Sequence, residues 1–133
     1  MKFLLDTNIC IYIIKQKPLE VLQKFNAYDL GDIGISSITV AELEFGVQKS
    51  QFPEKNRQAL TQFLLPLTVV DFDPAAAAMY GMVRAILEKQ GTTIGSLDTL
   101  IAAHALSLEL TLVTNNTREF SRVPNLKLEN WVS

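Results

Sequence analysis

Short apolar runs alternate with longer segments of helical periodicity along most of the chain. Short β-prone runs are typical of buried strands, whereas apolar residues repeated every three or four positions indicate helices. We predict strands at residues 2–5, 33–36, 67–70 and 110–114, with 126–128 as a candidate last strand. We predict helices at residues 7–15, 19–28, 40–50, 56–64, 74–90 and 97–108.

The order of these elements predicts the fold class. Parallel neighbouring strands need a crossover connection, and a helix usually supplies it. Strands that alternate with helices therefore indicate an α/β fold, a three-layer α/β/α sandwich around a central, mainly parallel sheet of four to five strands. No repeat, low-complexity tract or Gly/Ser-rich linker divides the sequence, so we predict a single domain over residues 1–133.

Three helix starts carry a local signal. Asp73 before Pro74 combines a capping acid with a proline at the first helical position. Thr39 and Glu42 have the spacing of a capping box, in which a hydroxyl and a carboxylate bond free backbone N–H groups at the helix start. Ser96 similarly stands ahead of an apolar run that extends to residue 108. These signals predict where three helices begin.

Composition and charge narrow the class of protein. With 12 Lys and Arg against 14 Asp and Glu, the formal net charge is −2, so any contact with RNA must be local. Cys10 and His104 are the only cysteine and histidine, which excludes a structural zinc site built from these two residue types. The apolar start is interrupted by Lys2 and Asp6 and is too short to span a membrane, so we expect a cytoplasmic protein.

Polar side chains lie where the predicted strands lead into helices. Asp6 follows the first strand, Glu42 lies near the start of the helix after the second, and Asp98 lies in the first turn of the last long helix. Asn116 follows the fourth strand, with Glu119 about one turn further on. Ligands of parallel α/β sheets bind outside the carboxyl ends of the strands. We therefore expect these four segments to deliver oxygen ligands to one edge of one sheet.

Each acid also has a purely structural interpretation. Asp6 could cap a helix, Glu42 fits a capping box, and Asp98 could stabilise the positive end of its helix. Three carboxylates within ~5 Å of one another, however, repel by roughly 3 kcal/mol per pair, and a divalent cation removes that repulsion. Oxygen ligands without a thiolate select Mg²⁺ or Mn²⁺. Together the acids predict a metal site for phosphodiester hydrolysis.

These motifs, in this order, resemble the PIN-domain ribonucleases, and more narrowly the VapC-type toxins of VapBC toxin–antitoxin pairs. The resemblance covers the chain almost end to end. The matching segments read LLDTN at residues 4–8, ISSITVAEL at 35–43, DTLIAAHA at 98–105 and LVTNNTREF at 112–120. No single segment is specific, but the ordered set in a chain of this length is.

The resemblance implies an α/β/α sandwich and Mg²⁺- or Mn²⁺-dependent endoribonuclease activity. It also implies a homodimer and inhibition by a VapB-type antitoxin. Close members of the family cut transfer RNA, often the anticodon stem-loop of the initiator type, and the resemblance extends that substrate to this chain. Asp6, Glu42 and Asp98 match the family's metal-holding acids, with Asp6 and Asp98 as the direct ligands.

One position departs from the family pattern. Many PIN domains carry a fourth acid where this chain has Asn116, whose amide brings an oxygen but no charge. Asn116 could still orient a metal-bound water as a catalytic residue, or Glu119 could take the fourth place, and the sequence leaves both open. Thr7 and Asn8, which are polar and adjacent to Asp6, are expected to hold its carboxylate in place, and supporting roles are also expected for Thr114 and Glu119.

Two other functions fit parts of the same pattern. A phosphatase of the haloacid-dehalogenase kind also begins with a strand and an aspartate, but it needs a second aspartate where this chain has Asn8. A non-catalytic binding module would use the acids only as helix caps and would show no metal dependence. His104, six residues after Asp98 on the same helix, points some 120° away from it, so we expect His104 in the packing or at the surface.

Overall fold

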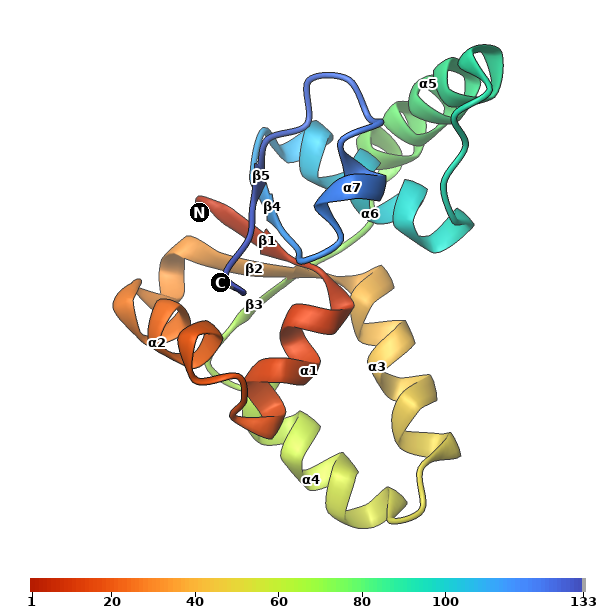
Figure 1. Cartoon of the computed structure of the whole chain (residues 1–133). Coiled ribbons are helices and arrows are strands. Elements are labelled where there is room, and N and C mark those ends of the chain that lie inside the picture. Colours follow the sequence, from red (N-terminus) through yellow and green to blue (C-terminus); the bar gives the residue numbers. More distant parts are fainter. Residues whose placement is uncertain (133) are drawn as a thin grey trace.

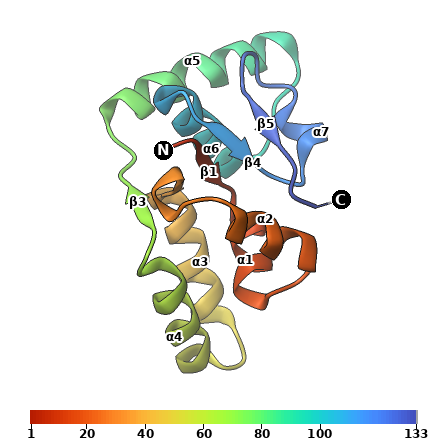
Figure 2. The same cartoon turned by 90° about the vertical axis from the view of Figure 1, so that its left-hand side faces the viewer.

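The computed structural model describes residues 1–132, and their strands form one five-stranded parallel sheet (Figure 1). The strands are β1 (Phe3–Leu5), β2 (Ile33–Ser36), β3 (Thr68–Val70), β4 (Thr111–Val113) and β5 (Leu128–Glu129). Their order is β3-β2-β1-β4-β5, and each neighbouring pair is parallel. Figure 2 shows β3 and β5 on opposite sides of the molecule. The predicted parallel sheet is confirmed.

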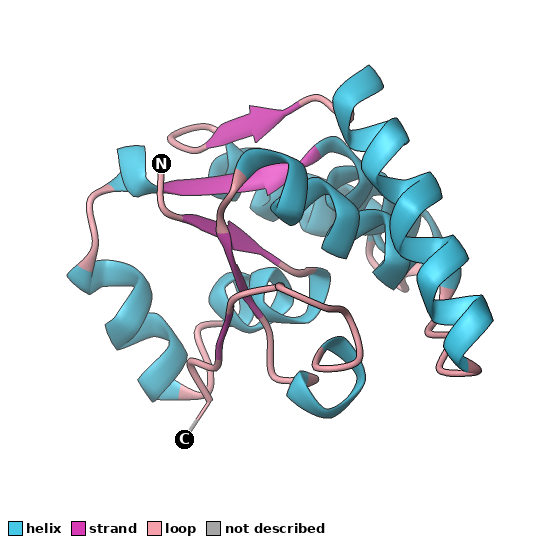
Figure 3. Ribbon diagram, turned by 90° about the horizontal axis from the view of Figure 1, so that it is seen from above, coloured by secondary structure: helices cyan, strands magenta, loops and turns pink. Residues whose placement is uncertain are grey.

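Helices cover both faces of this sheet, as Figure 3 shows from above. The sandwich predicted from the element order is therefore confirmed. The helices are α1 (Thr7–Lys15), α2 (Leu19–Ala27), α3 (Ser37–Lys49), α4 (Pro53–Leu64), α5 (Pro74–Gln90), α6 (Ser96–Leu108) and α7 (Thr117–Phe120), with a 3-10 turn at Leu30–Asp32. Within residues 1–132, no helix is long and apolar enough to cross a bilayer.

Strand β1 separates two hydrophobic cores because successive side chains of a strand point to opposite faces. Phe3 and Leu5 pack with residues of α1 to α4, and Leu4 packs with residues of α5 and α6. In the register of the sheet, Leu4 lies beside Leu112 of β4 and Leu5 beside Val113. The parallel ladder places the carboxyl ends of β1, β2 and β4 at the same edge, as expected.

The bounds of α1, β2 and α5 agree with the prediction, but α3 does not. Ser36 caps α3, because its Oγ accepts a hydrogen bond of 3.1 Å from the backbone N–H of Ile38. The helix thus begins at Ser37, three residues before the predicted start. Thr39 is buried inside the first turn and Glu42 lies in the second, so the predicted capping box is wrong.

Two other helix starts differ from prediction and one helix was missed. Gly95 occupies the N-cap position of α6 without a side-chain hydrogen bond, so Ser96 is the first helical residue rather than its cap. Helix α4 begins three residues early, with Pro53 in its first turn. The four-residue helix α7 has too few positions for a periodic signal, so the sequence did not predict it.

Candidate active site

Asp6 lies at the carboxyl end of β1 and begins α1. Its Oδ1 accepts a hydrogen bond of 2.9 Å from the backbone N–H of Ile9, as an N-cap residue does. The hydroxyl of Thr114 and the backbone N–H of Asn8 also bond the carboxylate. Asp6 is 5% exposed, and this burial raises its pKa although the three hydrogen bonds oppose the rise. The carboxylate is therefore fixed, buried and short of compensating charge.

Glu42 reaches the same place from α3. Its Oε1 accepts a hydrogen bond of 2.8 Å from the hydroxyl of Thr7, the first residue of α1. Thr7 was expected to hold Asp6, but it holds Glu42 instead. Asn8 was also expected to hold Asp6 with its side chain, yet that side chain is exposed and only its backbone contributes. Thr114, in contrast, is fully buried and bonds Asp6 as expected of a supporting residue.

Asp98 enters the site from the first turn of α6. Burial and the nearby charge of Glu119 raise its pKa from 3.8 to about 6, and a hydrogen bond with Glu119 together with the charges of Glu42 and Asp6 adds to the rise. A raised pKa of this origin is the signature of carboxylates that are forced together. Asp98 therefore keeps its proton at a higher pH than a free aspartate and shares it with Glu119.

Glu119 supplies a fourth carboxylate, held from two sides. Its Oε1 accepts a hydrogen bond of 3.0 Å from the backbone N–H of Gly95, and its Oε2 accepts one of 2.7 Å from the amide of Asn116. Chiefly the Gly95 N–H, and then the Asn116 amide, lower the pKa of Glu119. The sequence left the fourth place to Asn116 or Glu119. In the structure Glu119 contacts Asp98, while the side chain of Asn116 bonds Glu119.

The four acids act on one another electrostatically. The charge of Glu42 raises the pKa of Asp6, and the charges of Glu119, Glu42 and Asp6 all raise that of Asp98. This repulsion indicates that the end of β1 and the helices α3, α6 and α7 bring their acids near one another. In the part of the chain that the structure describes, no group of three His, Cys, Asp or Glu side chains is arranged to hold a metal ion.

The chemistry of this donor set fits a hard cation. All the charged candidate ligands are carboxylates. The chain's one cysteine, Cys10, is buried in the apolar core, and its one histidine, His104, bonds Ser36. Carboxylate oxygens suit Mg²⁺ or Mn²⁺, and a divalent charge would relieve the repulsion that raises the pKa of Asp98. His104 belongs to the packing, one of the two places expected for it, and Cys10 is fully buried as well.

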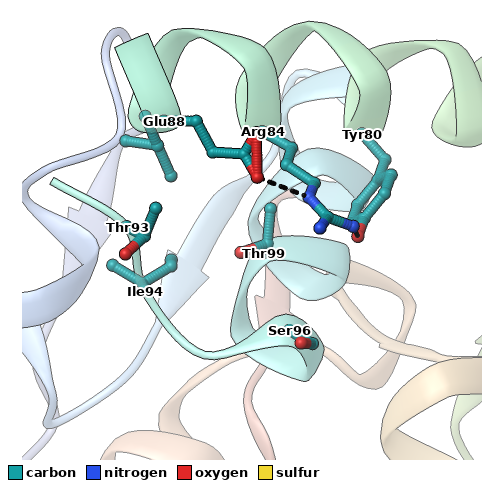
Figure 4. Close-up of a pocket in the computed structure, with 8 residues that line it drawn as sticks. Tyr80, Arg84, Glu88, Thr93, Ile94, Ser96 and Thr99 are labelled. Atoms are coloured by element: carbon teal, nitrogen blue, oxygen red, sulfur yellow. Dashed lines mark hydrogen bonds and ion pairs between the residues drawn. The ribbon is translucent and has the colours of Figure 1, made fainter. Parts of the chain in front are cut away.

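Two hollows flank the site. A groove of about 290 Å³ runs between α1, α3 and α4, with apolar residues such as Ile14 and Leu60 in its walls and Glu42 among its lining residues. A smaller polar pocket of about 120 Å³ lies between α5 and the start of α6 (Figure 4). In that pocket Arg84 donates hydrogen bonds to Glu88 and to the hydroxyl of Tyr80, so its positive charge is already partnered.

Comparisons with known proteins agree with this geometry. The PIN-domain family model matches residues 3–126. Ribonuclease VapC2 of Haemophilus influenzae is 52% identical over 132 residues, which is 99% of each chain. The tRNA(fMet)-specific endonuclease VapC of Shigella flexneri is 49% identical over 131 residues, 98% of each chain.

Solved structures give the same result. The DNA-bound VapBC of Salmonella typhimurium matches with a TM-score of 0.93 and 45% identity over 98% of each chain. VapBC2 of Rickettsia felis, bound to a DNA fragment from its promoter, matches with a TM-score of 0.91 and 44% identity over 98% of this chain and 99% of that one. The chain therefore belongs to the PIN-domain family and, within it, to the VapC group.

Proposed function

We propose that this protein is a metal-dependent endoribonuclease toxin of a type II toxin–antitoxin system. The observation that carries the proposal is the convergence of four carboxylates, Asp6, Glu42, Asp98 and Glu119, where burial and the charges of the other acids raise the pKa of Asp98 to about 6. Helix capping alone does not require such a cluster, whereas a site for a divalent cation does. Family membership supplies the reaction, which is hydrolysis of RNA phosphodiester bonds.

Asp6 and Asp98 would hold the cation directly, with Glu42 beside them. When bound, Mg²⁺ or Mn²⁺ supplies charge neutralisation at the phosphodiester and a more acidic water. Hydrogen bonds within the chain position these carboxylates: the N–H of Ile9 and the hydroxyl of Thr114 hold Asp6, and Thr7 holds Glu42. Asp98 must release its proton before it can bind a cation, which ties binding to pH.

Transfer RNA is the proposed substrate, and the anticodon stem-loop of the initiator type is the proposed target. The support is the identity of 49% to a relative named a tRNA(fMet)-specific endonuclease, over nearly the whole of both chains. The net charge of −2 means that RNA must be gripped by local positive groups rather than by the whole surface. No observation favours a phosphatase or a purely structural binding module.

A VapB-type antitoxin is the proposed partner, a homodimer is the proposed form of the toxin, and the cytoplasm is its proposed location. Solved structures similar to this chain in shape include complexes named VapBC from Salmonella typhimurium and Rickettsia felis. A toxin of this kind should arrest growth when it is expressed without its antitoxin. The Asp6→Asn form should be harmless at the same protein level, and equal toxicity of the two forms would contradict the toxin assignment.

The nuclease activity is tested with pure protein and a labelled transfer-RNA pool. Wild type should cut in Mg²⁺ or Mn²⁺ and not in EDTA, while Asp6→Asn and Asp98→Asn should lose at least a hundredfold in rate. Glu44→Gln is the matched control, because Glu44 lies on α3 like Glu42 but pairs with Arg57 at the surface. Cleavage that persists in EDTA, or in the two Asn variants, would refute the proposal.

A further inference from the structure

His104 lies in the core between the two helices that carry Glu42 and Asp98. It is 1% exposed, on α6, and its Nδ1 lies 2.8 Å from the Oγ of Ser36, which is fully buried at the end of β2. Ser36 in turn caps α3. A single side chain of α6 thus bonds the residue from which α3 begins.

The contact joins two groups that can each donate or accept. The Oγ of Ser36 accepts the N–H of Ile38, and the same hydroxyl can still donate to Nδ1 of His104 or accept a proton from it. The other ring nitrogen of His104, Nε2, is buried near the backbone of Asp71. Burial lowers the pKa of His104, which is consistent with a neutral ring.

Contacts of Phe72 connect the surroundings of His104 to the start of α3. The ring of Phe72 meets the His104 ring edge-on, with centroids 5.2 Å apart and planes at 75°. The backbone N–H of Phe72 donates a hydrogen bond of 3.0 Å to the hydroxyl of Ser37, the first residue of α3. The start of α3, the segment after β3 and the middle of α6 are thereby fixed to one another.

The two acids lie at matched distances from this contact. Asp98 precedes His104 by six residues on α6, and Glu42 follows Ser36 by six residues along α3, so each lies about 9 Å along its helix axis. A change in how α6 meets the start of α3 therefore moves Glu42 relative to Asp98. We propose that His104, by bonding Ser36, is a positioning residue that sets the spacing of Glu42 and Asp98. This inference rests on the proposed metal-dependent function.

Two substitutions at His104 separate hydrogen bonding from packing. His104→Leu fills similar space but offers no hydrogen-bonding group, whereas the side-chain amide in His104→Asn can donate or accept in place of Nδ1. In wild type, His104→Leu and His104→Asn, we would measure Mn²⁺ affinity by calorimetry and both kcat and KM for transfer RNA. Leu87→Ala, a core change on α5 away from the contact, is the control for lost stability.

His104→Leu should bind Mn²⁺ roughly tenfold more weakly and lose about tenfold in kcat, with KM for RNA within twofold of wild type. His104→Asn should recover most of both losses, and Leu87→Ala should show neither. In a Ser36→Ala background, His104→Leu should have no further effect, because the contact is already gone. Unchanged Mn²⁺ affinity in His104→Leu, or an Asn variant as impaired as the Leu variant, would overturn the inference.

A measurement without metal or RNA separates this inference from the proposed function. Amide hydrogen exchange in the first two turns of α3 should be about tenfold faster in His104→Leu than in wild type, relative to α5. His104→Asn should restore protection, and Leu87→Ala should not selectively expose α3. If wild type neither binds Mn²⁺ nor cuts RNA, the proposed function fails, and exchange alone decides whether His104 orders α3. Equal exchange in α3 of all variants would refute the positioning role.

Discussion

The hydroxyl of Thr7 donates a hydrogen bond of 2.8 Å to Oε1 of Glu42, a residue 35 positions later in the chain. Asp6, next to Thr7, is held by the backbone of the same helix start. The first turn of α1 thus orders two of the four acids: a backbone N–H holds Asp6, and the side chain of Thr7 holds Glu42. The start of α1 therefore positions an acid of α3 as well as capping its own helix.

Replacement of Thr7 should affect the rate more than the fold. Thr7→Val keeps the shape of the side chain but leaves Glu42 free to rotate, so we expect kcat to fall roughly three- to tenfold, with about 1 kcal/mol or less lost in unfolding free energy. Thr7→Ser keeps the donor and should be close to wild type. Steady-state cleavage assays and urea unfolding measure the two effects. A Thr7→Ser variant as slow as Thr7→Val would show that the hydroxyl is not what matters.

Removal of the Asp98 charge should stabilise the protein when no metal is bound. The folded-state pKa of about 6 exceeds the ordinary 3.8, so folding becomes less favourable as pH rises from about 4 through 6. Asp98→Asn cannot ionise, and its amide can donate to Glu119 as protonated Asp98 does. The full shift corresponds to about 3 kcal/mol, which solvent screening at this half-buried position reduces to roughly 1 kcal/mol.

Urea unfolding in EDTA measures this difference. Asp98→Asn should be more stable than wild type at pH 8 and equal to it at pH 4. The gap should open between these two values and stay constant above about pH 7. Equal stabilities at pH 8 would contradict the raised pKa of Asp98 in the folded state.

Metal should reverse this order of stability. A cation that binds only the folded protein stabilises it by about 2.7 kcal/mol at a hundred times its Kd, which for a domain of this size raises Tm by about 10 °C. Wild type should show this rise with Mn²⁺ at pH 8, whereas Asp98→Asn should show little. Thermal scans with Mn²⁺ and with EDTA measure the rise in Tm, and NaCl at matched ionic strength is the control. An equal rise in both proteins would place the ion elsewhere.

The fourth position can be assigned by a pair of substitutions. We expect Glu119→Gln to weaken Mn²⁺ binding about tenfold, because it removes a charge that contacts Asp98. Asn116→Ala should weaken it only about threefold, because Asn116 acts by holding Glu119. The double variant should be no weaker than Glu119→Gln alone, since both changes act through one carboxylate. Additive losses, measured by calorimetry, would show that Asn116 contributes separately.

Much of the fold could be predicted because several elements carry their own local signals. Asp73 and Pro74 define the start of α5, and the Asp73 carboxylate does accept the N–H of Ala76 at 2.9 Å. Asp6 similarly begins α1 where predicted. These capping contacts span only three residues, so they are visible in the sequence. Strand and helix alternation then gave the parallel sheet.

The start of α3 could not be predicted, because long-range contacts decide it. Ser36 and Thr39 are both capping residues by type, and the sequence favoured Thr39 because Glu42 follows at capping-box spacing. In the structure, His104 bonds Ser36 from 68 positions away, and Thr7 bonds Glu42. Long-range partners thus contact Ser36, which is the actual cap of α3, and hold Glu42 away from a capping role.

The candidate site, too, could be predicted in part and not in full. The convergence of Asp6, Glu42 and Asp98 followed from the rule that parallel strands end at one edge, and the electrostatic coupling of the three side chains agrees with it. The partners of Thr7 and Asn8 did not follow from any such rule, because side-chain direction at the first residues of a helix depends on packing. The catalytic and metal-binding roles of Asp6, Glu42 and Asp98 stay predictions.

The central place of β1 has a consequence for synthesis on the ribosome. β1 is made first, but its neighbour β4 begins only at Thr111, and Glu119 comes later still. A nascent chain can therefore pair β1 with β2 early, but the other edge of β1 stays open until β4 has been made, and loop closure over such a length is slow. Any product that terminates before β4 lacks the neighbour on which Asp6 rests. With this order of elements, the four acids can come together only after almost all of the residues have been joined.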